Sequence, residues 1–206
     1  MCWNAEVSLE TYYMALICVS IGLVGGFPWK MLLFFMVFSS MQLFEYYIWS
    51  HLNDASLNQF YSKFGYAIIT LEPAAALWLI SGSQWTTGRN IAIGCYLMIM
   101  GFYTILNRID YRTTVGQNGH LHYHFVPSGF GLYQWLWILA FFTGIGFSGD
   151  MFVILISMAT CLYSLYQMWW KHEFNSYWCY VANVIWIYVV GWVIWHQMRL
   201  TGQKKR

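Results

Sequence analysis

The sequence predicts an all-α, polytopic membrane protein with seven transmembrane helices. Of its 206 residues, 59% are hydrophobic and only 9% are charged, whereas soluble domains carry about 25% charged residues. Aromatic residues make up 21% of the chain, which suits a protein that meets two membrane interfaces, where Trp and Tyr rings settle among the headgroups. Seven apolar stretches approach the roughly 20 residues that a span requires. They cover about residues 8–26, 31–51, 63–82, 91–108, 131–149, 151–170 and 177–197.

Turn residues set the boundaries of these stretches. The chain begins with MCWNAEVSLE, which lacks the basic segment of a secretory signal, so we expect the first span to be retained. It ends at a Gly-Gly pair before Pro28, which is a turn signal. Only residues 148–150 separate the fifth and sixth stretches, so these two spans should form a tight helical hairpin.

The longest connection, residues 109–130, has the pattern of a β-hairpin. Residues 111–115 and 120–126 are strand-like runs, and Asn118-Gly119 lies between them. An Asn-Gly pair between alternating runs is a strong hairpin signal. We therefore expect a short β-hairpin over the outer mouth of the helices.

The charges predict the orientation of the chain. The net charge of +2 is too small to indicate nucleic-acid binding. If residues 199–206 form a basic cytoplasmic tail, six Lys and Arg residues lie inside and four outside, in agreement with the positive-inside rule. We expect one seven-helix domain over residues 1–198, an outer N-terminus, a cytoplasmic C-terminus and the lipid bilayer as its partner.

Glu45 lies within the second predicted span. Gln42, Glu45 and Trp49 follow one another at helical spacing and share one face. An ionisable group in hydrocarbon costs at least about 2.5–3.5 kcal/mol, so it marks a candidate functional site. The carboxyl group must find a polar partner, a water-filled cavity or a proton. Two readings stay open here, a proton or cation site and a packing device.

Glu72 lies near the middle of the third predicted span, directly before Pro73. Proline lacks a backbone donor, so it frees a carbonyl one turn earlier and kinks the helix. Residues 74–76 are all Ala, and small residues permit a close approach of helices. A cavity-lining carboxyl and a structural kink are both compatible with this pattern.

Polar residues elsewhere in the spans are candidate partners for the two glutamates. The predicted ion pathway comprises Glu45, Gln42, Trp49, Glu72, Asn107, Arg108 and Asn183, and Gln134 and Gln167 are further candidates.

The histidines predict a metal site on the outer side. His120, His122 and His124 alternate, so on a strand they share one face. With His51, His172 and Cys2 they form a candidate Zn²⁺ or Cu²⁺ site, to which Glu6 and Glu173 are potential additions. The alternative is a polar hairpin face at headgroup level, and no HExxH motif or pair of spaced CxxC motifs supports a familiar zinc pattern.

Two familiar seven-helix classes lack their key residues here. A retinal protein needs a lysine in its last span, and residues 177–197 contain none. Membrane hydrolases of the ceramidase and adiponectin-receptor type use a HxxxH pair late in the chain, whereas the last span offers only His196. Cys2 and Cys179 lie on the same predicted side, which leaves a disulfide between them open.

Short motifs resemble those of an uncharacterised multi-span membrane family found in bacteria and large DNA viruses. They are the opening Met-Cys-Trp-Asn-Ala, the Gln-x-x-Glu-x-x-x-Trp pattern of Gln42, Glu45 and Trp49, and the Gly-His-Leu of residues 119–121. Asn4 stands where Ser is more usual in that family. The resemblance groups Cys2, Trp3, Gln42 and Glu45 as a set and implies no particular reaction.

Three functions follow from these features. The first is a small transporter or channel-like protein with a proton or cation site at the buried glutamates. The second is a membrane-embedded, metal-dependent enzyme acting on a lipid. The third is a non-catalytic structural or assembly protein of a viral or cellular membrane. The ion or solute and the oligomeric state stay open.

Overall fold

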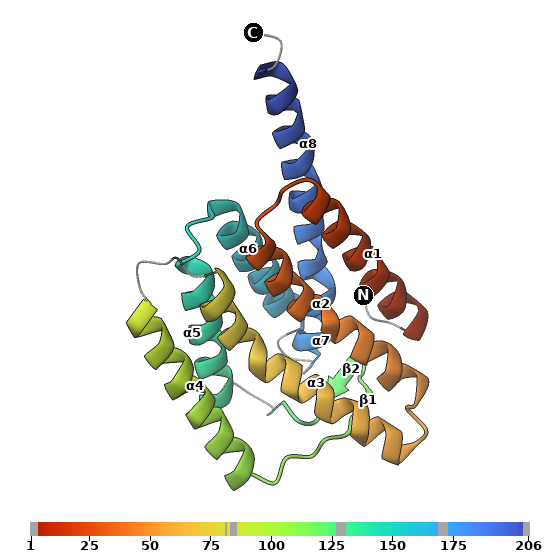
Figure 1. Cartoon of the computed structure of the whole chain (residues 1–206). Coiled ribbons are helices and arrows are strands. Elements are labelled where there is room, and N and C mark those ends of the chain that lie inside the picture. The colour runs from red at the N-terminus through yellow and green to blue at the C-terminus, as the bar shows by residue number, and fades with distance from the viewer. Residues whose placement is uncertain (1–3, 81, 83–85, 127–130, 169–172, 204–206) are drawn as a thin grey trace.

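The computed structural model describes residues 4–80, 82, 86–126, 131–168 and 173–203 as a helical bundle with one small sheet (Figure 1). The order is α1 (Ala5–Val24), α2 (Trp29–Ser50), α3 (Ala55–Ala75) with a π-helical continuation η1 (Ala76–Ile80), α4 (Thr86–Leu106), β1 (Thr113–Val115), β2 (Leu121–Tyr123), α5 (Leu132–Gly146), α6 (Met151–Met168), α7 (Phe174–Val181), a 3₁₀ turn η4 (Ala182–Val184) and α8 (Ile185–Gln203).

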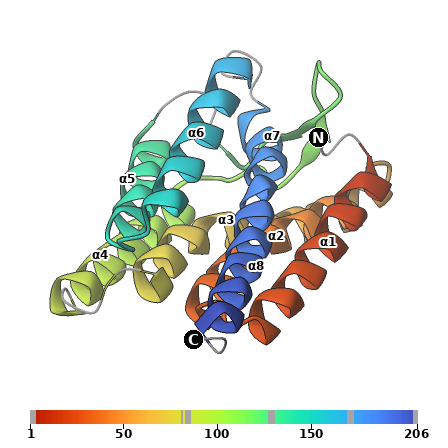
Figure 2. The ribbon, with the colours of Figure 1, turned by 90° about the horizontal axis from the view of Figure 1, so that it is seen from above.

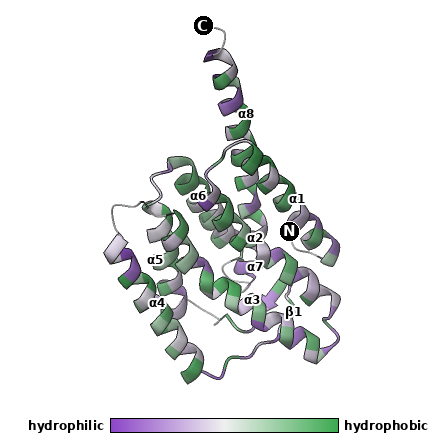
Figure 3. Cartoon of the chain, viewed as in Figure 1, coloured by the Kyte–Doolittle hydropathy of each residue, from purple (hydrophilic) through white to green (hydrophobic). Residues whose placement is uncertain are grey.

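Within the described residues, six helical segments are long and apolar enough to cross a membrane. They are α1, α2, α3 with η1, α4, α6, and the continuous segment from α7 to α8. Hydrophobic residues dominate these helices, and hydrophilic residues appear at the end of α8 (Figure 3). The prediction of an integral, multi-pass, helical membrane protein is therefore confirmed.

The count of seven spans is not confirmed, because α5 is short. It has 15 residues, which extend about 22 Å at 1.5 Å per residue, and the hydrocarbon core is about 30 Å thick. Gly131 starts the helix, and its backbone N–H donates to the Gln134 side chain at 3.0 Å. The left-handed Gly149 (φ 72°) then turns the chain toward α6.

The last segment is longer than predicted and is broken. It runs from Phe174 to Gln203, and the turn η4 interrupts it at residues 182–184. Residues 199–203 are therefore helical, beyond the predicted domain boundary at residue 198, and residues 204–206 lie outside the described residues. In Figure 2, α8 runs between α5 and α6 on one side and α1 and α2 on the other.

The two strands lie within the predicted 109–130 connection. They pair antiparallel, with Thr113 opposite Tyr123 and Val115 opposite Leu121. Gly119 has a left-handed φ of 77° at the turn. Leu121, Tyr123 and Phe125 are buried in the bundle. The strands lie at the end of the bundle where α1 begins, away from the C-terminal end of α8; the assignment of this end to the outer side stays a prediction.

Backbones approach closely where α5 meets η1. A methyl group at Gly144 would lie 2.6 Å from the backbone of Ala76 and Leu77. Ala76 itself is fully buried. Ala76, the last of the three alanines after Pro73, thus contacts a glycine of another helix, which is the close packing that small residues permit.

Gly144→Ala should lower the stability of the protein by about 1–3 kcal/mol, the usual cost of overpacking. The matched control is Gly101→Ala in the middle of α4, where an added methyl would meet no atom within 4 Å. Because alanine favours helices, this control should keep or slightly raise stability. Thermal unfolding in detergent measures both variants. Equal unfolding midpoints for Gly144→Ala and the parent would contradict the close contact.

Candidate functional site

Pro73 lies inside α3, where a proline is expected to kink the helix. Side chains of neighbouring helices bond the carbonyl groups one turn before it. The carbonyl of Ile69, one turn before Pro73, has no proline N–H to accept from. Trp137 of α5 donates its indole N–H to that oxygen at 2.5 Å. Tyr96 of α4 donates its hydroxyl to the next carbonyl, Thr70, at 2.8 Å. Because lipid offers no hydrogen bonds, these two side chains stabilise the kink.

The helix continues after the kink as the π-helical segment η1. The backbone N–H of Ala76 is shared between the carbonyl oxygens of Glu72 and Pro73. Short π-helical segments within α-helices frequently occur at functional sites. The segment of α3 around Glu72 therefore combines a proline, a change of helical pitch and an ionisable side chain.

Glu72 is only 1% exposed. Among the residues that the structure describes, its Oε1 atom has no hydrogen-bond partner. The carboxyl group lies within electrostatic range of the Tyr96 and Tyr133 hydroxyl groups, on α4 and α5. Burial without a hydrogen bond is costly. Chemically, this arrangement can bind a proton or a small cation.

Glu45 has a different environment, because it contacts the hairpin. The side chain is fully buried, and the hydroxyl of Tyr123 on β2 donates to its Oε1 atom. Gln42 is also fully buried one turn earlier, and Trp49 is partly buried against the core. The predicted Gln42, Glu45 and Trp49 face therefore points into the protein and meets the strand.

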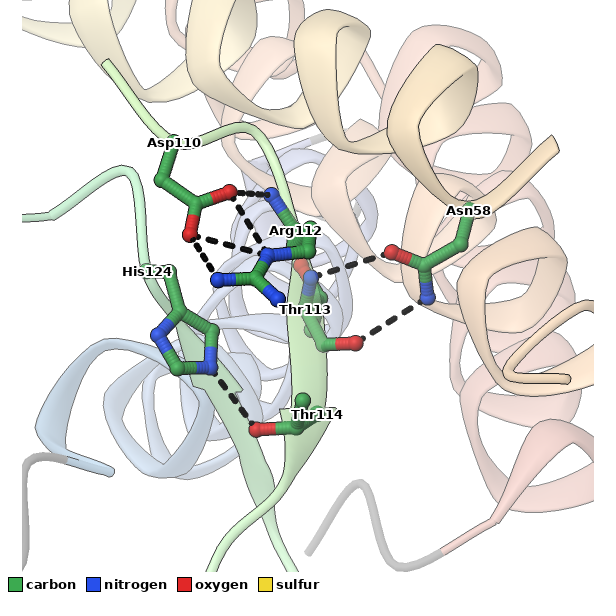
Figure 4. Close-up of polar contacts among 6 residues, drawn as sticks. All are labelled: Asn58, Asp110, Arg112, Thr113, Thr114 and His124. Atoms are coloured by element: carbon green, nitrogen blue, oxygen red, sulfur yellow. Dashed lines mark hydrogen bonds and ion pairs between the residues drawn. The ribbon is translucent and has the colours of Figure 1, made fainter. Parts of the chain in front are cut away.

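Helix α3 also holds the hairpin. Asn58 of α3 forms a pair of 3.0 Å hydrogen bonds with the backbone N–H and carbonyl of Thr113 (Figure 4). Ser62, one turn later, lies 2.7 Å from the Thr113 hydroxyl. All three side chains are buried. The strand β1 is thus attached to α3 by its backbone and by its side chain.

Glu173, at the start of α7, holds the hairpin turn. Its carboxylate accepts from the Asn118 backbone at 3.1 Å, from the Asn118 side chain at 3.2 Å and from the His120 backbone at 3.3 Å. Gly116 leaves space for this carboxylate, since a methyl group there would overlap it. Glu173, a potential addition to the predicted metal site, thus orders the hairpin turn through these hydrogen bonds.

The histidines do not share one environment. His120 is buried with its ring edge-on to Tyr177 at 5.5 Å. His122 and His124 stack at 4.6 Å, and His124 is exposed and contacts Thr114 at 3.0 Å. The His51 ring lies 2.8 Å from the carbonyl of Tyr47.

Within the described ranges, no three His, Cys, Asp or Glu side chains form a group that could hold a metal ion. Cys2 and His172 lie outside those ranges, so a metal site that includes them stays a prediction. Cys179, which could pair with Cys2 in a disulfide according to the sequence analysis, is buried.

The remaining predicted pathway residues lie elsewhere. Asn107 is exposed at the end of α4 and donates to the Tyr103 carbonyl, and Arg108 is also exposed. Asn183 is buried at the η4 break, where it donates to the Cys179 carbonyl at 2.7 Å and accepts from Trp186 at 3.2 Å. The hydrogen bonds of Asn183 thus connect α7 to α8.

The sequence did not reveal the aromatic hydrogen-bond donors near Pro73 and at Glu45. Tyr96 and Trp137 bind the carbonyls at the kink, and Tyr123 binds Glu45. Pro73 does signal that the Ile69 carbonyl needs a donor. In a chain with 13 Trp and 16 Tyr, no pattern distinguishes the aromatic residues that supply one.

The fold and these residues define an integral, multi-pass, helical membrane protein in which, among the described residues, the side chains of Glu45, Glu72 and Glu173 are buried. The sequence matches no known protein family, and comparisons with curated proteins and with solved structures give no significant match.

Asn58→Ala should loosen the hairpin, because it leaves the buried N–H and carbonyl of Thr113 without their side-chain partner, at a cost of about 1–3 kcal/mol. Hydrogen exchange of residues 109–126 should become faster. The control is Asn90→Ala at an exposed position of α4, which should leave that exchange unchanged. If residues 109–126 exchange at the same rate in Asn58→Ala as in the parent protein, Asn58 does not hold the hairpin.

Arg112→Gln should raise the pKa of Asp110 toward its ordinary value. The hydrogen bonds from Arg112, 2.6 Å to Oδ2 at the closest, hold the pKa of the partly exposed Asp110 below that value (Figure 4). The contribution of the Arg112–Asp110 hydrogen bonds is thus fully present above the ordinary carboxyl pKa. It is lost as the pH falls through the lowered pKa of Asp110. Carbon NMR titration of Asp110 in detergent measures this. An unchanged pKa in the variant would exclude Arg112 as the cause.

Proposed function

We propose that the protein transports a small cation, a proton or a metal cation, across its membrane, with Glu72 as the binding group. The observation that carries the proposal is the buried Oε1 atom of Glu72, which has no hydrogen-bond partner in the described structure. A buried carboxyl group without that bond only destabilises the fold unless it binds something. Ionisable residues in membrane spans commonly belong to ion pathways and proton relays.

The kink next to Glu72 supports transport over a purely structural role. Transporters place ion sites at discontinuous helices near the middle of the bilayer. Here Pro73 directly follows Glu72, and α3 changes to the π-helical η1 after Ala75. Trp137 and Tyr96 from other helices bond the carbonyls before Pro73. A helix held in this way can change its bend when the donors shift, and the ion site would then face the other side.

Glu45 has a positioning role in this proposal. Its bond to Tyr123 joins α2 to the hairpin, while Asn58 joins α3 and Glu173 joins α7. Three helices thus hold the hairpin across one end of the bundle. We place this end outside, with the N-terminus, because the opposite end of α8 carries Arg199 and the basic C-terminal residues.

Glu72→Gln should reduce cation flux in proteoliposomes by about tenfold or more, the change that follows from losing about 1.4 kcal/mol of binding. The amide has a similar shape but takes up no proton at neutral pH. Glu10→Gln, at an exposed position of α1, is the control and should transport as the parent does. Glu45→Gln keeps an oxygen that accepts from Tyr123 and should retain most of the flux.

A folded Glu72→Gln variant with parental flux would overturn the proposal. Equal thermal unfolding midpoints for Glu72→Gln and the parent would show that a loss of flux is not a loss of fold.

A further inference from the structure

We infer that the cation is a proton, and that it reaches Glu72 from the hairpin end of the bundle along a file of buried and partly buried hydroxyl groups. This inference rests on the proposed function of Glu72. It concerns four side chains that lie between the hairpin and the kink, namely Tyr66, Thr104, Tyr133 and Thr70.

The outer end of the file lies under the loop before β1. Tyr111 in that loop contacts the Tyr66 ring edge-on, with ring centres 5.5 Å apart. Partial burial raises the pKa of Tyr111, so its hydroxyl is already partly removed from water. The Tyr66 hydroxyl, on α3, forms a 2.6 Å hydrogen bond with the Thr104 hydroxyl on α4. A polar contact between helices thus begins at the hairpin.

The inner end of the file reaches Glu72. The Tyr133 ring of α5 stacks on Tyr66 with centres 6.3 Å apart. Its hydroxyl lies 3.5 Å from the Thr70 hydroxyl and within electrostatic range of the Glu72 carboxyl. Tyr66 and Tyr133 are 6% and 3% exposed, respectively. Hydroxyl groups therefore follow α3 from residue 66 to residue 72 inside the bundle.

The chemistry of this file favours a proton. Each Tyr or Thr hydroxyl both donates and accepts a hydrogen bond. A proton that binds an outer hydroxyl can therefore be matched by release of that hydroxyl's own proton to the next group, until the Glu72 carboxylate takes the last one. One proton enters and one O–H bond forms on Glu72, with no oxidation or reduction. The steps between Tyr66 and Tyr133 and from the inner hydroxyls to Glu72 need a bridging water.

A metal cation fits this route poorly. The hydroxyl oxygens of Tyr66 and Thr104 are 2.6 Å apart, which leaves no room for a metal cation between them. It would also have to lose its water shell beside aromatic rings that supply few oxygen ligands, whereas hard cations take about six or more. Proton transfer needs no such opening.

The test compares Tyr→Phe variants, which keep the ring and remove the hydroxyl. Proton flux is measured with a pH-sensitive dye inside proteoliposomes, under an imposed pH gradient, in H₂O and in D₂O. Tyr133→Phe and Tyr66→Phe should each lower proton flux by about tenfold or more, since a positioned acid–base group contributes at least that much to proton transfer. Tyr166→Phe, at a position that is 83% exposed on α6, is the control.

The outcomes separate this inference from the proposed function. If Glu72→Gln abolishes proton flux while Tyr66→Phe and Tyr133→Phe transport as the parent does, the file is wrong and the Glu72 site stands. If the parent moves Na⁺ or K⁺ but no protons, the identity of the ion is wrong. If Tyr133→Phe does not fold, Thr104→Val tests the same file from α4, and parental proton flux in that variant would overturn the inference.

Discussion

One backbone carbonyl of α3, which Pro73 leaves without a partner in its own helix, determines how α5 packs against α3. Pro73 cannot donate to the Ile69 oxygen, and lipid offers no substitute. The indole of Trp137 supplies the missing hydrogen bond and thereby fixes α5 against α3. The same approach brings Gly144 against the backbone of η1. Glu72, directly before Pro73 on α3, is also buried.

The second constraint is the attachment of the hairpin to three helices. Glu45, Asn58 and Glu173 come from α2, α3 and α7, and each bonds a different part of the hairpin. The two constraints are connected through α3, which carries Asn58 near its start and Glu72 near its end. Between them lies the file that begins at Tyr66, so a change at the hairpin can reach the kink along one helix.

Part of this architecture follows directly from the sequence. Apolar stretches predict the membrane class, Pro73 predicts the kink, and Asn118-Gly119 indicates a turn between strand-like runs. The sequence does not predict the length of α5, because its apolar stretch continues to residue 149 although the helix ends at Gly146. The alternation of His120, His122 and His124 predicts that they share one strand face. His120 instead precedes the first residue of β2 and is buried against Tyr177.

Infrared difference spectroscopy of the reconstituted protein tests the role of Glu72 most directly. Spectra recorded above and below the pH range in which flux changes should contain the C=O band of a carboxylic acid that gains or loses its proton. If Glu72 binds the proton, Glu72→Gln removes this band and Glu10→Gln leaves it in place. A band that persists in a folded Glu72→Gln protein, or a parent without one, would contradict proton binding at Glu72.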